Sequence, residues 1–178
     1  MIPGKEMPDK QSGSERKGIS TEMKIRRAEE KDSDKIMDLL SQVLEIHAGI
    51  RPDIFIPGTT KYTKSELAEI LKDDTRPVYA AVDEEDRLVG YAFCMLQEQP
   101  KSENMRQFRS MYIDDLCVDE SGRGQGIGQA LFDHVKAEAQ RLGCREVTLN
   151  VWEGNDSAKA FYEHRGMKPM KTIMEMIL

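Results

Sequence analysis

Three alternating glycines lie in the segment Arg123-Gly124-Gln125-Gly126-Ile127-Gly128. The apolar run from Met111 to Val118 comes before this segment and predicts a β-strand. Apolar residues recur at helical spacing from Ile127 to Leu142, and Gly143 is placed to end that helix in a left-handed conformation. The segment therefore predicts a tight strand-to-helix connection, which is typical of α/β folds.

Glycines at these positions would allow the turn to bind an anion. Without Cβ atoms, the backbone N–H groups can approach the oxygens of a diphosphate closely. The first turn of the following helix has unpaired N–H groups, and the helix dipole adds partial positive charge there. A turn that only closes a tight connection would explain the same glycines, so both interpretations stay open at this point. The spacing is neither that of a P-loop nor the G-x-G-x-x-G of dinucleotide-binding folds.

The remainder of the chain predicts a single α/β domain over residues 23–178. Residues 1–22 are polar and small, and we expect them to form a flexible N-terminal tail. The element order βααβββαβαβ predicts a mixed sheet flanked by helices. Strands are expected at 23–26, 78–82, 88–96, 111–118, 146–152 and 172–178, and helices from Asp32 or Ser33 to Leu44, from the capping box Thr63–Glu66 onward, at 127–142 and at 157–164.

Composition and charge exclude several classes of function. The formal net charge of −6 argues against a nucleic-acid ligand, and there is no apolar run long enough to cross a membrane. The three cysteines, Cys94, Cys117 and Cys144, have the spacing of neither a disulfide framework nor a zinc site, so no metal is predicted. We therefore expect a cytoplasmic protein, and the sequence leaves a homodimer open.

The glycine-rich turn and a later segment together resemble a known family. Residues 123–128 match the [Q/R]-x-x-G-x-[G/A] signature of the GNAT superfamily of N-acetyltransferases. Residues 155–167 look like the N-x-x-A-x-x-[FL]-Y-x-x-x-G-[FM] element of the same family. Within the superfamily the chain looks most like the ribosomal-protein-alanine N-acetyltransferase type. The resemblance implies a GNAT fold, with two splayed central parallel strands that hold acetyl-CoA, and transfer of its acetyl group to a primary amine.

The resemblance also assigns the site residues. Asn155 matches the asparagine that contacts the cofactor near its sulfur, although an asparagine there also suits a helix N-cap. Tyr162 matches the tyrosine that protonates the departing thiolate, and we favour this role over the alternative of a tyrosine that only packs beside Phe161. The backbone N–H of Cys117 would stabilise the oxyanion, and its thiol is expected to be a small buried hydrophobe. The pantetheine arm would lie on Leu116, Cys117 and Val118, and the pyrophosphate on Arg123, Gly124, Gln125, Gly126, Ile127, Gly128 and Gln129.

One departure from the family pattern concerns the general base. The alanine-acetylating relatives carry a glutamate five residues before the cofactor asparagine, and this chain has Asn150, which cannot take a proton. We rank Asp115 first as the base, and the alternatives are Asp114, Glu153, His47 or a chain of waters. Each of these side chains also has a purely structural interpretation. The departure is the feature that favours a second hypothesis, a CoA-binding sensor or interaction module without turnover.

The acceptor is not specified by these motifs. A peptide N-terminus, a lysine, a polyamine or an antibiotic amine would each suit the expected reaction. In the family that the chain resembles, the first two helices and the loop between them select the acceptor, which here means residues 36–71. Phe55 and Trp152 are candidates for the wall of that pocket, although packing in the core is the expectation for both.

Overall fold

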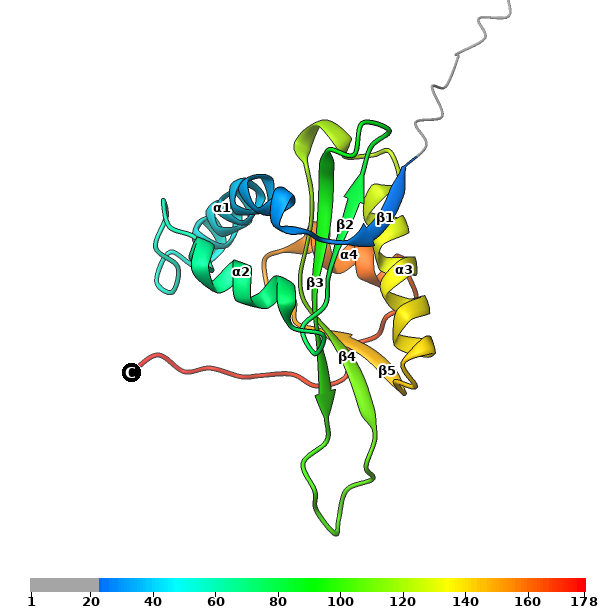
Figure 1. The fold of residues 1–178 in the computed structure, drawn as a ribbon. Coiled ribbons are helices and arrows are strands. Elements are labelled where there is room, and N and C mark those ends of the chain that lie inside the picture. Colours follow the sequence, from blue (N-terminus) through cyan, green and yellow to red (C-terminus); the bar gives the residue numbers. More distant parts are fainter. Residues whose placement is uncertain (1–22) are drawn as a thin grey trace, which may run out of the picture.

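The computed structural model describes residues 23–178, and the expected N-terminal tail at 1–22 lies outside the described residues. One five-stranded sheet forms the centre of the protein, with its strands in the order β1-β2-β3-β4-β5 (Figure 1). Neighbouring strands are antiparallel except β4 and β5, which are parallel, so the expected mixed and mostly antiparallel sheet is confirmed. The strands are β1 (Lys24–Arg27), β2 (Val78–Val82), β3 (Leu88–Glu98), β4 (Arg109–Val118) and β5 (Glu146–Leu149).

Helices cover both faces of this sheet (Figure 1). The helices α1 (Ser33–Ile50) and α2 (Lys64–Lys72) pack on one face, and α3 (Ile127–Arg141) and α4 (Asp156–His164) pack on the other. The inner strand β2 is buried along its whole length, because alternate side chains point into the two helical layers. Short 3₁₀ helices at Glu30–Asp32 and Glu120–Gly122 precede α1 and α3.

The helix ends follow the expected local chemistry. The predicted capping box is present, because Thr63 Oγ1 accepts a hydrogen bond from the Glu66 N–H at 3.2 Å and the Thr63 N–H donates to Glu66 Oε2 at 2.7 Å. After α3, Gly143 adopts a left-handed φ of 71°, as predicted. The next N–H, that of Cys144, returns to the Ala139 carbonyl at 2.9 Å and closes the helix end.

The prediction of a last strand at 172–178 is wrong. This segment is extended but has no strand partner among the described residues, and it runs away from the sheet toward the C-terminus (Figure 1). Its large side chains are exposed, with Ile173 at 79% and Met176 at 84% of full accessibility. The alternation of residue types indicates a segment that can form a strand, but it does not supply the neighbour that a strand requires. The strand β5 is also shorter than predicted and ends at Leu149.

No helix in the part of the chain from residue 23 onward is long and apolar enough to cross a membrane.

Candidate active site

The strands β4 and β5 part after a short stretch of pairing. Ser110 to Ile113 of β4 pair with the four residues of β5, and β4 then continues alone on that side to Val118. The backbone groups of Leu116, Cys117 and Val118 therefore face a gap with no strand from the described residues in it. A gap of this kind between parallel strands can bind a ligand that supplies its own amide groups, as a pantetheine arm does.

The glycine-rich turn lies at the end of β4 and has the geometry of an anion site. Gly124 and Gly126 have φ values of 76° and 83°, in the left-handed region that glycine adopts most readily. A Cβ atom at either position would meet no other atom within 4 Å, so the space above the turn is open. Gly126 is also the N-cap of α3, so the first N–H groups of that helix face the same space.

The charges around this helix end also favour an anion. The helices α1, α2 and α4 each carry an acidic residue in the first turn, whereas α3 carries none. A carboxylate there would compete with a bound phosphate for the helix N-terminus. The residues present therefore fit the pyrophosphate of CoA on a basis that is independent of the sequence motif.

The other residues of the turn have distinct positions. Arg123 is exposed and its Nε lies 3.4 Å from the Val118 carbonyl, and Gln125 donates to the Ser121 carbonyl at 3.0 Å. Ile127 is buried in the core, so its side chain anchors α3 while its N–H lies at the helix start. Gly128 is partly buried near the Phe161 ring and Gln129 is exposed.

A β-bulge in β4 brings two carboxylates to the same face of the sheet. Phe93 of β3 pairs with Asp115 and Cys94 pairs with Ile113, so Asp114 is an extra residue in β4. Without the bulge, adjacent residues would point to opposite faces. The shift is visible in the packing, because Ile113 and Leu116 both contact the α3 layer, whereas Asp114 and Asp115 both bond to tyrosines of the α1 and α2 layer.

The two carboxylates have different environments. Asp115 accepts a hydrogen bond from the hydroxyl of the fully buried Tyr91 at 2.8 Å, and burial raises the pKa of Asp115 to about 6. Asp114 accepts from the Tyr62 hydroxyl at 2.7 Å and pairs with Lys61 Nζ at 2.7 Å. Asp115 therefore holds a proton more readily than an ordinary carboxylate does, and Asp114 is already paired with an alkyl ammonium.

Tyr162 lies in α4, in the layer that packs on the face of the sheet opposite Asp114 and Asp115. Its ring packs against Phe161 at 5.0 Å and Phe132 at 6.1 Å between ring centroids. Burial, and to a lesser degree the negative charge of Asp115, raises the pKa of Tyr162, so the phenol stays protonated across the physiological range. Its hydroxyl makes no hydrogen bond to any residue within 23–178, which leaves the proton available to a ligand.

The two asparagines of the motif have structural partners. Asn155 is the N-cap of α4, and its Oδ1 accepts from the Ala158 N–H at 3.2 Å. That bond uses the amide oxygen and leaves the amide nitrogen for another contact. Asn150 is exposed and donates from Nδ2 to the Tyr112 hydroxyl at 3.1 Å.

The remaining candidates for the base differ in position. Glu153 is exposed in the turn after β5. His47 is partly buried on α1, with its ring 5.2 Å from that of Phe55, and burial followed by the positive charge of Lys61 lowers its pKa. The Cys117 thiol is buried, as expected, and burial raises its pKa to about 12, which keeps it in the unreactive thiol form.

An aromatic pair, of which Trp152 is exposed and Phe55 is partly buried, lies beside the end of β5. Phe55 and Trp152 meet edge to face with their ring centroids 5.4 Å apart, and the Arg51 guanidinium lies 5.7 Å from the Trp152 ring. Trp152 is 39% exposed, so the expectation that it packs in the core is wrong. It follows a strand that ends earlier than predicted, which places it on the surface next to the α1–α2 loop.

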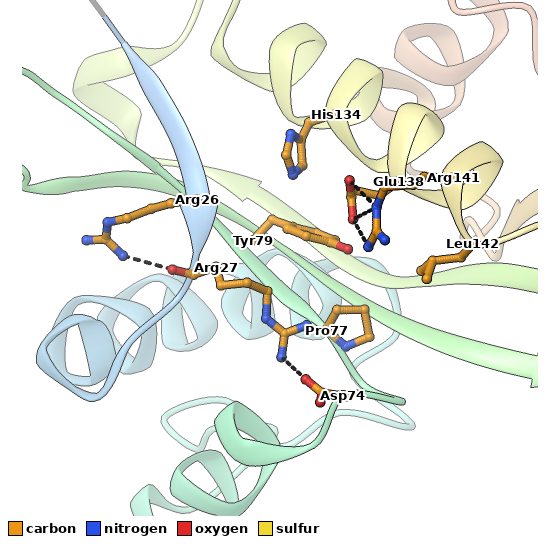
Figure 2. Close-up of a pocket in the computed structure, with 9 residues that line it drawn as sticks. All are labelled: Arg26, Arg27, Asp74, Pro77, Tyr79, His134, Glu138, Arg141 and Leu142. Carbon is orange, nitrogen blue, oxygen red and sulfur yellow. Dashed lines mark hydrogen bonds and ion pairs between the residues drawn. The ribbon is translucent and has the colours of Figure 1, made fainter.

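A cavity of about 540 Å³ lies elsewhere, on the α3 face near the edge strand β1 (Figure 2). Its charged groups all take part in ion pairs, and those of Arg26 are with Asp32 and Asp86 outside the cavity. Arg27 lies 3.7 Å from Asp74, and Arg141 binds Glu138 at 2.8 Å, as Figure 2 shows. The cavity is separate from the gap between β4 and β5.

Comparison with known proteins agrees with this geometry. The family model described as the acetyltransferase (GNAT) family matches residues 40–167. A bovine (Bos taurus) thialysine N-epsilon-acetyltransferase is 28% identical over 82% of this chain and 84% of its own. The peptidyl-lysine N-acetyltransferase YjaB of Escherichia coli is 31% identical over 64% of this chain and 68% of its own. The crystal structure of a mutant of the BH1408 protein from Bacillus halodurans superposes with a TM-score of 0.83 and 34% identity, covering 86% of this chain and 98% of that one.

Proposed function

The chain belongs to the GNAT family of acetyltransferases, and we propose that it transfers the acetyl group of acetyl-CoA to the primary amine of a lysine-like acceptor. The observation that carries this proposal is the pair of carboxylates that the bulge in β4 places on the acceptor side of the sheet. Asp115 is suited to accept a proton, and Asp114 is suited to bind an alkyl ammonium. The acetyltransferase domain is proposed to span residues 23–178 and to work in the cytoplasm.

The proposed reaction is direct attack in a ternary complex. Asp115 removes a proton from the acceptor ammonium, which is necessary because an alkyl amine is mostly protonated at neutral pH. The free amine then attacks the thioester carbonyl, and the N–H of Cys117 stabilises the negative charge on the carbonyl oxygen. As the C–S bond breaks, Tyr162 donates its proton to the departing CoA thiolate, and the nitrogen of the new amide returns its extra proton to the tyrosinate. The turn from Arg123 to Gln129 and the cap residue Asn155 hold CoA in place.

The lysine-like acceptor rests on two kinds of support. Lys61 of this chain already places an alkyl ammonium 2.7 Å from Asp114, so this carboxylate is able to pair with such a group when Lys61 moves aside. The relatives above are named for acetylation of thialysine and of peptidyl lysine. A protein N-terminus that begins with alanine, the acceptor type of the ribosomal-protein-alanine enzymes, stays the second candidate, because residues 123–128 and 155–167 resemble that type.

A measurement of thiol release from acetyl-CoA tests the proposal. The panel includes lysine, thialysine, a peptide with an internal lysine, a peptide that begins with alanine, a polyamine and an aminoglycoside, and CoA binding is measured separately. We expect release with the lysine-like amines. CoA binding without release for any amine would support the alternative of a non-catalytic CoA-binding module, and no CoA binding would contradict both.

Replacement of the proposed acid should affect turnover and not binding. Tyr162→Phe keeps the packing against Phe161 and Phe132 but removes the proton donor. We expect kcat to fall by about 10²-fold, in the range typical of general acids, while the KM for acetyl-CoA changes little. Steady-state kinetics with the best amine of the panel provide the measurement. An unchanged kcat would remove Tyr162 from the mechanism.

The ammonium-binding role of Asp114 predicts opposite effects for two variants. Asp114→Asn should raise the KM for the amine by roughly 10-fold or more, because a hydrogen bond to a charged group contributes about 1.5–3 kcal/mol. Lys61→Met keeps the carboxylate and removes the competing ammonium, so the KM should fall. Both variants are measured with the same amine. An increase in KM for both would indicate that the Lys61–Asp114 pair only holds the loop in place.

A further inference from the structure

The amine of Lys61 lies where the proposed function places the amine of the acceptor. Lys61 belongs to the loop between α1 and α2, and its Nζ atom is 2.7 Å from Asp114 Oδ2. Burial raises the pKa of Asp115 and lowers that of His47, and the positive charge of Lys61 acts on both groups as well. The ammonium therefore lies within electrostatic range of Asp115, the proposed base. A lysine of the chain itself thus occupies the position of a lysine-like substrate.

This ammonium is bound to a fixed group but is not buried. The Lys61 side chain is 41% exposed, whereas that of Asp114 is 12% exposed. The Tyr62 hydroxyl donates to the same Asp114 oxygen at 2.7 Å, and the Tyr62 ring stacks on that of Phe93 with 5.6 Å between the centroids. Lys61 Nζ lies 5.6 Å from the centroid of the Tyr62 ring, which adds a cation–π contact. The core therefore fixes Asp114, and the amine that it binds stays accessible from solvent.

The main chain beside Lys61 is also held in place. Thr63, two residues later, is the N-cap of α2 and forms the capping box with Glu66. Thr60 Oγ1 donates to the Tyr62 carbonyl at 2.8 Å. Lys61 thus reaches Asp114 of its own chain without a rearrangement of the loop. An amine that is already held beside the base has a large advantage over a free lysine, because its positioning entropy is lost in folding.

The other paired lysines provide a contrast. Those that form ion pairs within residues 23–178 bind carboxylates other than Asp114 and Asp115, and they are Lys31, Lys35, Lys64 and Lys72. The side chains of Lys64 and Lys72 are 72% and 71% exposed. An uncatalysed reaction with acetyl-CoA would therefore reach these two more readily than Lys61. Position, and not exposure, distinguishes Lys61.

We propose that the protein acetylates its own Lys61 within one chain, an inference that rests on the proposed function because it uses the same reacting groups. Asp115 takes a proton from the Lys61 ammonium. The free amine forms a C–N bond with the thioester carbonyl carbon, and the C–S bond breaks. The CoA thiolate takes the proton of Tyr162, and the nitrogen of the new amide returns its extra proton to the tyrosinate. The products are free CoA and an uncharged acetyl-Lys61.

Self-acetylation changes the state of the acceptor site. Acetyl-Lys61 carries no charge and cannot form the ion pair with Asp114. The carboxylate is then released to bind the ammonium of an external amine. Lys61 therefore blocks the site in the unmodified protein and leaves it after one turnover on the chain itself.

Mass spectrometry on the full chain, incubated with acetyl-CoA and no amine, provides the first test. We expect one acetyl group per chain, located by peptide mapping at Lys61, with Lys64 and Lys72 as internal controls that stay largely unmodified. The rate per molecule should not change when the protein is diluted by about tenfold, because the reaction is unimolecular in the complex with acetyl-CoA. Faster modification of Lys64 and Lys72, or a rate that falls with dilution, would overturn the proposal.

Two variants separate a catalysed reaction from a chemical one. Tyr162→Phe should slow acetylation of Lys61 by about 10²-fold and leave the slow background at Lys64 unchanged. Lys61→Arg keeps a cation beside Asp114, but its guanidinium stays charged and takes no acetyl group. The pre-acetylated natural protein should have a KM for the amine roughly 2- to 5-fold lower than that of Lys61→Arg, as expected for release of a partly exposed ion pair. Equal KM values would contradict the release of Asp114.

Failure of this inference is distinguishable from failure of the proposed function. Thiol release with an amine of the panel while Lys61 stays unmodified would overturn self-acetylation and leave the acetyltransferase reaction in place. Bound CoA with neither thiol release nor modification of Lys61 would contradict both. Acetylation of Lys61 at a rate that depends on Tyr162 would support both.

Discussion

Gly126→Asp is expected to abolish CoA binding while the fold stays intact. Gly126 has a φ of 83°, a conformation that aspartate and asparagine adopt more readily than other non-glycine residues, and a Cβ there meets no atom within 4 Å. The new carboxylate would lie against the pyrophosphate at the N-terminus of α3. Two like charges about 4 Å apart repel by about 4 kcal/mol at an effective dielectric constant of 20. The Kd for CoA should therefore rise by roughly 100-fold or more.

Gly126→Asn is the matched control for this effect. Asparagine has nearly the same shape and backbone preference as aspartate but carries no charge. Titration calorimetry with CoA measures both variants, and thermal unfolding without ligand checks that each is folded. Equal losses of affinity would mean that the side chain blocks the turn sterically. Affinity close to that of the natural protein in both variants would contradict the placement of the pyrophosphate at this turn.

The conformation of the glycine-rich turn was predictable because its signals are local. The positions that need a left-handed φ, the helix start and the apolar stripe of α3 all lie within 20 residues of Gly124. The capping box at Thr63 and the end of α3 at Gly143 are local in the same sense, and the structure confirms both. The positions of the five strands along the chain also follow from the sequence, because each run of β-forming residues is bounded by its own turns.

The part of the site where we propose that the acceptor amine binds depends on contacts between residues that are distant in sequence. Tyr62 reaches Asp114 across 52 positions, and nothing in the α1–α2 loop marks it as a partner of a carboxylate in β4. The bulge that brings Asp114 and Asp115 to one face is a property of the β3–β4 register, which the alternation of side chains does not reveal. The C-terminal segment shows the same limit, because its own pattern predicts a strand but does not supply the neighbouring strand that it would need.

Asp115→Asn is expected to abolish most turnover. Asparagine keeps an amide oxygen that can accept the hydrogen bond from Tyr91, but it cannot take a proton from the acceptor. Loss of a general base typically lowers kcat/KM by about 10²–10⁴-fold. In the natural protein, activity should rise with pH through about 6, where Asp115 ionises, and the variant should lose this limb of the profile. A profile that keeps the limb would assign the base to another group.

The same substitution should stabilise the fold, and this gain separates a catalytic role from a structural one. The pKa of Asp115 is raised from 3.8 to about 6, so the folded state holds the proton more tightly than the unfolded state does. The natural protein therefore loses stability as pH rises from about 4 to 6, by about 3 kcal/mol in total. Asp115→Asn cannot ionise, so urea unfolding should show it to be more stable than the natural protein at pH 8 and similar at pH 4. A buried base that ionises is expected to lower the stability of the fold, so its removal should not lower stability further. If the variant were both inactive and less stable at pH 8, the lost activity would therefore be attributed to a damaged fold.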